Sequence, residues 1–497
     1  MSVLAKNTAW NLLGQLAPML AAVFAIPLLI AGMGVDRFGV LTLAWMVLGY
    51  FSVFDLGLGR ALIVLISEKL GAGRLEEIPA LTWTAIWLML LLGAVGGVLM
   101  WGLAGWLTTD ALEIPPDLVT ETTRTFRWLA LSVPVVIVTT GLRGVLEAYQ
   151  RFDLVNLARM PLSVLTFVSP LCVLPFSDRL DWIVLSLLGV RAVFFMVSVA
   201  LVRVVNPDLL KRIHWDKRYL KSMLGFGGWM TVTNLVGPFM MYLDRFAIGS
   251  ALGMTAVAYY VTPYELVTKL LVIPGALVGV LFPMFSSSLI KDSSKVAALF
   301  WAGVRWIFIG LFPAVLVLCV FAEEGLTIWL SEAFAQNSSA VLQWLAVGVL
   351  INSLAFVPFG FIQAAGRPDL TAKLHLLELP PYLGLLWLGM TQFGLLGVAI
   401  VWTIRVAFDA VAMFYIATTL DAQLKWRFKY IAWLLLALMI LFSGSWINSF
   451  LVRLPYTIII ILLFAVAAWR CLLLSSERDY VKQHIKQRLK FFKGSIA

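Results

Sequence analysis

Residues 81–107 read LTWTAIWLMLLLGAVGGVLMWGLAGWL and contain no ionisable side chain. A helix needs about 20 apolar residues to cross the hydrocarbon core of a bilayer, and this run exceeds that length. In lipid the backbone must form its hydrogen bonds within the segment, so such a run predicts a spanning helix. The stretch therefore places the chain among integral membrane proteins.

The same apolar character extends over the whole chain. Of its 497 residues, 61% are hydrophobic and 13% are charged, whereas soluble domains carry about 25% charged residues. The apolar runs have the length of a spanning helix and not that of a barrel strand. We therefore predict an all-α polytopic membrane protein with about 14 transmembrane helices. Their approximate ranges are 8–32, 39–66, 81–107, 123–148, 154–176, 181–203, 220–250, 255–287, 298–322, 339–364, 371–390, 394–418, 429–447 and 454–474.

The connections between these runs alternate in charge. Lys and Arg gather in one set, for example in RVVNPDLLKRIHWDKRYLK at 203–221, whereas the other set is short and poor in them, for example GVDRFG at 34–39. Basic loops stay in the cytoplasm under the positive-inside rule. The sequence therefore predicts that both termini are cytoplasmic. The rule also accounts for the net charge of +10 without a nucleic-acid partner.

An internal repeat divides the chain into two halves. A shift of 219 residues aligns Trp10 with Trp229 and Gly34 with Gly253, and the longest basic connection follows the sixth predicted span. Six spans per half give both halves the same orientation, so the repeats are parallel, with an axis along the membrane normal. The predicted parts are the six-helix lobes 1–205 and 220–420, the cytoplasmic linker 206–219, two additional transmembrane helices in 421–475 and a basic cytoplasmic tail, 476–497.

Motifs of catalytic chemistry are absent from the sequence. It has no GxxxxGK[ST] nucleotide-binding loop, no HExxH metal site and no GxSxG nucleophile elbow. The three cysteines, Cys172, Cys319 and Cys471, lie in apolar surroundings without metal-ligand spacing. The predicted external loops are as short as plain connectors. The sequence therefore favours a transporter over an enzyme and predicts no metal or organic cofactor.

Ionisable residues inside the predicted spans are the candidate functional residues, because each costs at least about 2.5 kcal/mol at the centre of a spanning helix. Three pairs have i,i+4 spacing, which places both members on one helix face. Each pair is either a structural ion pair or part of a polar cavity, and the sequence leaves both interpretations open. The pairs are Arg143/Glu147, Glu265/Lys269 and Arg405/Asp409.

Other arginines in the spans have no acidic neighbour at helical spacing. Arg60 and Arg305 lie towards the cytoplasmic ends of their spans, where a long side chain can also reach the interface, whereas Arg191 is nearer mid-span. Bases outnumber acids inside the spans, which favours an anionic cargo. The predicted cargo contacts are Arg60, Arg191, Arg245, Lys269 and Arg305, and the candidates for ion coupling or for orienting the arginines are Asp55, Asp244, Glu265 and Asp409.

Two spans carry residues that weaken a helix. Gly57 and Gly59 lie in the second span, within FDLGLGR at 54–60, and Pro274 and Gly275 lie in the eighth. Interrupted helices at comparable places in two halves point to the working site of a repeat transporter. We predict that the second and eighth spans bend at these hinge residues during transport.

Three stretches of the chain resemble a known family. They are NTAWNLLGQLAPMLAAVFAIPLLIAGMGVDRFGVLTLAWMVLGYFSVFDLGLGRAL at 7–62, YLDRFAIGSALGMTAVAYYVTPYEL at 242–266 and GRPDL at 366–370. All three are similar to the polysaccharide flippases of the multidrug/oligosaccharidyl-lipid/polysaccharide exporter superfamily, which include the O-antigen and capsule-unit flippases of bacteria. The resemblance covers the whole chain in span number, halving and charge order.

The resemblance implies a V-shaped bundle of two six-helix lobes around a central cavity, which works by alternating access. It implies that the cargo is a polyprenyl-diphosphate-linked oligosaccharide, moved across the bacterial inner membrane for the biosynthesis of surface polysaccharide such as lipopolysaccharide O-antigen. Coupling to H⁺ or Na⁺ is also implied, as are membrane lipids and other polysaccharide-assembly proteins as partners. A diphosphate requires cationic groups in a wet cavity, which agrees with the excess of bases.

Two other functions remain open at the level of sequence. A multidrug or cation antiporter of the same superfamily would usually lack the last two helices and would carry prominent carboxylates in its cavity. A membrane glycan polymerase or ligase would usually need a substantial external loop for its site. The two additional spans and the short loops therefore favour the flippase.

Overall fold

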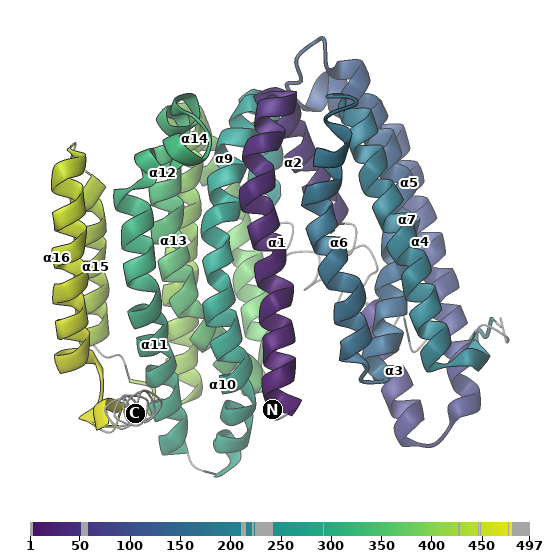
Figure 1. Ribbon diagram of the computed structural model, residues 1–497. Helices are drawn as coiled ribbons and strands as arrows, with labels where there is room; N and C mark the ends of the chain where they lie inside the picture. The colour runs from purple at the N-terminus through teal and green to yellow at the C-terminus, as the bar shows by residue number, and fades with distance from the viewer. Residues whose placement is uncertain are drawn as a thin grey trace, which may run out of the picture. The chain divides into compact units, whose positions relative to one another are not determined.

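The computed structural model is helical in the part of the chain that it describes (Figure 1). Nine helices in this part are long and apolar enough to cross a membrane, by length and composition. Asp55 and Gly57 lie outside the described residues, and so does the side chain of Arg60. The described residues are 3–50, 58–209, 215–220, 223, 242–291, 293–425, 428–445, 447, 449–475 and 477–479.

The chain forms two compact units: unit 1 comprises Met1–Thr262 and Leu386–Val398, and unit 2 comprises Pro263–Leu385 and Ala399–Ala497. In unit 1, residues 242–251 are helical and α9 (Gly253–Thr268) begins soon after them. The other helices of unit 1 are α1 (Val3–Met33), α2 (Val35–Tyr50), α3 (Leu58–Gly71), α4 (Ile78–Trp106), α5 (Val119–Ala148), α6 (Phe152–Val173) and α7 (Leu180–Val205).

Helix α5 is central to the packing of unit 1. It contacts α2, α3, α4 and α7, while α6 packs against α1 and α7. A Cβ on Gly93 of α4 would lie 2.6 Å from the Cα of Pro134, and one on Gly97 would lie 2.8 Å from the carbonyl oxygen of Ala130. Small residues let helix backbones approach closely in membrane proteins. The close approach of α4 and α5 therefore explains glycine at both positions.

The loops of unit 1 gather into two groups, one at each end of α4. At the first end, Lys69 and Tyr219 both contact Glu77, which precedes α4. At the other end, the backbone N–H of Glu113 donates to the carbonyl oxygen of Gly249. A helix with the 29 residues of α4 is about 43 Å long. The loops of the first group belong to connections predicted as cytoplasmic, and those of the second group to connections predicted as external. The alternation of basic and weakly charged loops along the sequence therefore matches the two ends at which these loops lie.

Two features of unit 1 support the internal repeat. Gly34 and Gly253 both have a positive φ, of 83° and 82°, which glycine adopts without strain. The same shift of 219 residues relates Asp36 to Thr255, and the hydroxyl of Thr255 donates a hydrogen bond to the carboxylate of Asp36. A contact between equivalent positions is expected close to a two-fold axis. The boundaries of the predicted lobes stay a prediction.

Unit 2 begins within α9, and a 3₁₀ turn, Lys269–Leu271, separates α9 from the next helix. Pro274 lies in the first turn of that helix and cannot donate a hydrogen bond to the preceding turn, which explains the interruption. The remaining helices are α10 (Val272–Lys291), α11 (Ser293–Val320), α12 (Ala322–Trp329), α13 (Glu332–Ala364), α14 (Pro368–Leu420), α15 (Phe428–Ser445) and α16 (Phe450–Ala467). Of α14, the middle part Leu386–Val398 is counted with unit 1.

Of the predicted hinge residues, Gly59, Pro274 and Gly275 lie in the described part of the chain. Gly275 follows Pro274 at the start of α10, directly after the 3₁₀ turn. Gly59 lies inside α3, and a Cβ on Gly144 of α5 would be 2.9 Å from the carbonyl oxygen of Gly59. The glycines at 59 and 144 therefore also serve close packing of α3 on α5. Bending at these places during transport stays a prediction.

Helix α14 is a hairpin of two arms. Gly394 has φ 57° and ψ −139°, which is not helical, and it separates a first arm, 368–393, from a second arm, 395–420. The arms run back along each other, because His375 of the first lies 3.4 Å from Asp409 of the second. The two arms correspond to the separate spans that the sequence predicts at 371–390 and 394–418.

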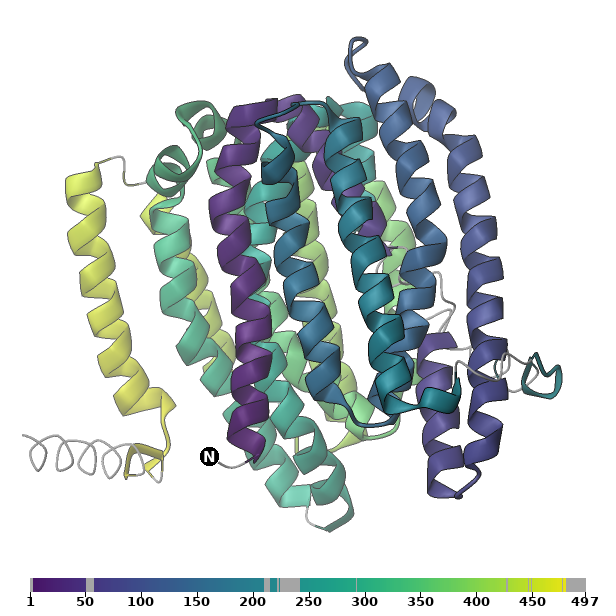
Figure 2. The same ribbon diagram turned by 45° about the vertical axis from the view of Figure 1, so that its right-hand side comes forward.

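The last two helices, α15 and α16, stand at the edge of unit 2 (Figure 1), and α16 is the yellow helix at the left of Figure 2. The buried Arg453 of α16 contacts Glu324 at 2.6 Å and Glu323 at 3.4 Å, both on α12. At the other end of α16, Lys429 of α15 donates to the carbonyl oxygen of Cys471. These charged contacts attach α16 to unit 2 and join the two helices to each other.

Replacing Gly93 with Ala is expected to lower the free energy of unfolding by about 1–3 kcal/mol, because the added Cβ meets the backbone of Pro134. Gly102→Ala on the same helix is the matched control, since a Cβ there meets nothing within 4 Å. Thermal unfolding of the detergent-solubilised protein, followed by tryptophan fluorescence, compares the two variants. Equal melting temperatures would contradict the close contact between α4 and α5.

Candidate functional site

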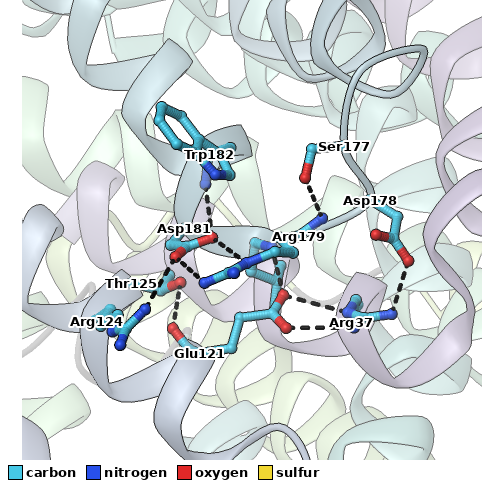
Figure 3. Close-up of polar contacts among 10 residues, drawn as sticks. Arg37, Glu121, Arg124, Thr125, Ser177, Asp178, Arg179, Asp181 and Trp182 are labelled. Carbon is cyan, nitrogen blue, oxygen red and sulfur yellow. Dashed lines mark hydrogen bonds and ion pairs between the residues drawn. The ribbon is translucent and has the colours of Figure 1, made fainter.

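A network of charged side chains joins three helices at one end of unit 1 (Figure 3). Arg37, at the start of α2, donates two hydrogen bonds of 3.2 Å to Glu121 of α5 and one of 3.1 Å to Asp178. Arg179, directly before α7, donates two hydrogen bonds of 3.1 and 2.7 Å to Asp181, and these hold the pKa of Arg179 above its ordinary value. We call this group the outer network.

The outer network is balanced in charge and acts as a structural clamp. Glu121 also accepts a hydrogen bond from the backbone N–H of Leu180, so one carboxylate joins α2, α5 and the first turn of α7. Arg124 lies 3.9 Å from Asp181 and brings three arginines against three carboxylates. A balanced network offers little attraction to an anionic ligand.

A second group of arginines in unit 1 lines a cavity of about 230 Å³ between α2, α5, α6 and α7. Arg143 comes from α5, Arg159 from α6 and Arg191 from α7. Thr139 and Thr140 add hydroxyl groups, and most of the remaining lining is apolar. We call this the cationic cavity, and it contains one of the predicted cargo residues, Arg191.

The cationic cavity has an excess of positive charge. Arg143 contacts Glu147 at 3.3 Å, which confirms the i,i+4 pair predicted from the sequence. Within the described ranges, neither Arg159 nor Arg191 has a carboxylate oxygen within 4 Å. A guanidinium inside a membrane helix requires an anion or water beside it. The arrangement therefore has the chemistry of an anion-binding site.

Asp244 and Arg245, predicted as a coupling residue and a cargo contact, are both buried in unit 1. The carboxylate of Asp244 accepts a hydrogen bond of 2.7 Å from the hydroxyl of Tyr260. The guanidinium of Arg245 lies 5.0 Å from the centroid of the Tyr242 ring. The lining of the cationic cavity does not include Arg245, so the two predicted cargo arginines in the described part of unit 1 have different surroundings.

In unit 2, the two predicted cargo cations are paired with acids. Lys269 contacts Glu265 at 3.0 Å, as the helical spacing predicts. Arg305 is 2% exposed and contacts the carboxylate of Glu477 and the hydroxyl of Tyr430. An ion pair with Glu477 therefore accounts for the buried Arg305.

The third predicted pair is wrong in this structure. Arg405 and Asp409 do not contact each other among the described contacts. Instead, each meets a residue of the first arm of α14. Arg405 Nε lies 3.6 Å from Glu378 Oε2, and His375 Nε2 lies 3.4 Å from Asp409 Oδ1. The reason is that packing of the two arms brings other partners beside the same side chains. We call these four residues the α14 cluster.

Three residues of these sites were missed by reasoning from the sequence. Arg159 lies on α6 and within the predicted span 154–176, but so close to the basic residues before that span that reasoning from the sequence counts it with them and not as a candidate site residue. Glu378 and His375 lie inside the predicted span 371–390, and an ionisable residue within a span is itself a signal of function. Their partners are on the following span, so no helical spacing reveals the contacts.

The family model of the polysaccharide biosynthesis protein family matches residues 33–339, which include the three arginines of the cationic cavity. The chain belongs to this family. Among its relatives, a "Putative O-antigen transporter" of Shigella flexneri is 32% identical over 417 residues, which cover 83% of this chain and 97% of the relative. An uncharacterised membrane protein in the cps region of Klebsiella pneumoniae is 21% identical over 425 residues, 82% of this chain and 81% of the relative.

Solved structures share the fold of this family member. The lipid II flippase MurJ, in an inward closed conformation, has a TM-score of 0.72 at 13% identity, over 94% of this chain and 99% of MurJ. An inward-facing multidrug resistance MATE transporter of the MOP superfamily has a TM-score of 0.71 at 16% identity, over 83% of this chain and 98% of the transporter. The protein therefore has a MATE- and MurJ-like helical membrane fold.

Removal of either partner of the buried pair Arg305–Glu477 is expected to destabilise the protein by about 3–5 kcal/mol, because the other charge stays buried alone. Arg305→Ala and Glu477→Ala should lower the melting temperature to similar extents, and the double variant should be no worse than the worse single one. Arg143→Ala is the matched control, expected to cost about 1 kcal/mol or less, since the Arg143 side chain is 48% exposed. If Arg305→Ala melts at the same temperature as the wild type, the ion pair does not account for Arg305, and Arg305 becomes a candidate cargo contact again.

Proposed function

We propose that this protein moves O-antigen units, linked through a diphosphate to a polyprenyl lipid, across the bacterial inner membrane. The observation that carries the proposal is the cationic cavity, where Arg159 and Arg191 lie in a membrane domain without carboxylate partners in the described chain. A lipid diphosphate is an anion, and guanidinium groups bind phosphate oxygens in pairs. The family of the chain and the name of its Shigella relative support the same cargo.

The size of the cavity suggests which part of the cargo it receives. Its volume, about 230 Å³, is below the roughly 300–1,000 Å³ of small-molecule sites. We propose that it holds the diphosphate or an acidic sugar and not a whole oligosaccharide. Arg143 and Arg159 lie near the helix ends that flank the loop Tyr149–Arg151, so they would attract the anion from the cytoplasm. Arg191, in the middle of α7, would contact it deeper in the membrane.

The proposed architecture has 14 spans, arranged as two parallel six-helix lobes and two additional helices, with both termini in the cytoplasm. The matched glycines Gly34 and Gly253 and the hairpin of α14 support this count. MurJ matches a larger share of the chain than the MATE transporter does, 94% against 83%. That difference favours a flippase with two additional helices over a drug exporter.

The test of the function locates complete lipid-linked repeat units in a strain that lacks the gene. The units should accumulate in the cytoplasmic leaflet, where an impermeant glycosidase added to spheroplasts does not reach them, whereas units in the parent strain should be cleaved. Accessible but unpolymerised units in the deletion strain would instead indicate a polymerase. Normal units together with altered drug sensitivity would indicate a drug exporter.

Arg159→Ala and Arg191→Ala are each expected to reduce surface O-antigen about tenfold or more, because a hydrogen bond to a charged group contributes about 1.5–3 kcal/mol. The measurement is lipopolysaccharide electrophoresis at equal amounts of the membrane protein, judged by immunoblot. Arg124→Ala, at the exposed edge of the outer network, is the control and should keep normal O-antigen. Normal O-antigen in both cavity variants would exclude the cationic cavity from cargo binding.

A further inference from the structure

The α14 cluster holds four ionisable groups between the two arms of the α14 hairpin, and all four belong to unit 2. The side chain of Glu378 is 2% exposed, that of Asp409 10%, that of Arg405 15% and that of His375 26%. All four lie within a span of apolar sequence, where an ionised group is costly. His375 is therefore the most exposed member of the cluster.

Glu378 is the least satisfied member of the cluster. Neither of its carboxylate oxygens has a hydrogen-bond partner among the described residues. Its ion-pair partner, Arg405 Nε, is 3.6 Å away, which is beyond hydrogen-bond distance. The carboxylate of Asp409 is close enough to act on it as a like charge. Keeping such a carboxylate buried as an ion is costly, and binding of a proton removes that cost.

Charged groups on the neighbouring helices do not neutralise Glu378. Helix α13 packs on the second arm at Trp402, α9 at the same ring through Tyr264, and α11 and α15 beside Phe414. In the described part of the chain, the charged groups of these helices and of the start of α14 do not reach Glu378. Glu332 and Lys295 lie at helix starts. The others have partners elsewhere: Glu265 pairs with Lys269, Arg305 with Glu477, Lys429 with the carbonyl oxygen of Cys471, and Asp369 with Arg367 and Lys373.

The four residues of the cluster have two complete sets of partners. In this structure the pairs cross from one arm to the other. Helical spacing also allows pairs within each arm, Glu378 with His375 at i,i+3 and Arg405 with Asp409 at i,i+4. The first arm is weakened next to Glu378, because Pro380–Pro381 cannot donate hydrogen bonds to the preceding turn. The cluster therefore has the parts of a two-state element.

The repeat places opposite charges at equivalent positions. A shift of 219 residues relates Arg159 of the cationic cavity to Glu378 of the α14 cluster. One copy of this position thus presents a cation suited to an anionic cargo. The other presents a buried carboxylate suited to a proton.

We propose that the α14 cluster is the proton-binding site of the transport cycle, in which Glu378 takes up a proton from water by way of His375. This inference rests on the proposed function, since it concerns the ion that drives transport. When Glu378 is protonated, Arg405 loses its anionic partner on the first arm and pairs with Asp409 on its own arm, which loosens the ties between the arms. Release of the proton to water restores the pairs between the arms.

Dicyclohexylcarbodiimide, which reacts with protonated carboxyl groups in apolar surroundings, tests the proposal on the full-length protein in lipid nanodiscs. Labelling of Glu378, measured by peptide mass spectrometry, should increase as the pH falls. Glu265 is the internal control and should stay unlabelled, because it pairs with Lys269 at 3.0 Å and is one-third exposed. Labelling that is independent of pH, or that Na⁺ suppresses at constant pH, would overturn the proton site.

Two variants have opposite expected effects on this labelling. Arg405→Gln removes the cation that stabilises the carboxylate, so the pH at which half of Glu378 is labelled should rise by about one unit. Asp409→Asn removes the like charge, so that pH should fall by about one unit. Arg405→Lys keeps the charge and is the matched control, with labelling close to that of the wild type. A shift in the same direction for both neutral variants would contradict the proposed electrostatics.

Transport in proteoliposomes gives a separate readout. Glu378→Gln keeps the side chain neutral, so the variant should move lipid-linked oligosaccharide at a rate that no longer responds to an imposed pH gradient. A Gln variant that still responds would overturn the proton site and leave the proposed function intact. If the wild-type protein labels at Glu378 but moves no lipid-linked oligosaccharide, the proposed function fails and the labelling result stands.

Discussion

A charge inside a membrane helix must be neutralised by something other than water, and this constraint organises the structure. In lipid, apolar burial does not select helix neighbours as it does in water. Charged pairs and close backbone contacts therefore determine which helices pack together. Arg453 meets Glu324 and Arg305 meets Glu477, each across helices far apart in sequence. Such pairs, together with close glycine contacts, determine which helices of a unit lie side by side.

The same constraint separates structural charges from functional ones. In the outer network every arginine faces a carboxylate, and the network can only hold helices together. The cationic cavity keeps positive charge in excess, so it attracts an anion. In the described part of the chain, the Glu378 carboxylate of the α14 cluster has no hydrogen-bond partner, which favours binding of a proton. Each departure from balance in these groups thus predicts the chemistry of a ligand.

The proposed internal repeat relates the two proposed tasks to a single fold. Backbone geometry is alike in the two copies, since Gly34 and Gly253 share a positive φ that only glycine adopts freely. Side-chain charge differs between the copies, since Arg159 and Glu378 occupy equivalent positions. Backbone conformation has to match for the helices to pack, whereas a side chain that faces a cavity can change its charge without changing the packing.

The sequence by itself determined the class of the protein, the alternation of its loops and the pairs Arg143/Glu147 and Glu265/Lys269. These follow from apolar run length and from the spacing of a single helix, which are local properties. Tertiary structure decided that Arg405 meets Glu378, that Asp409 meets His375 and that Arg159 joins Arg191 in one cavity. Those contacts join separate helices, and helical spacing carries no information about which helix faces lie against each other.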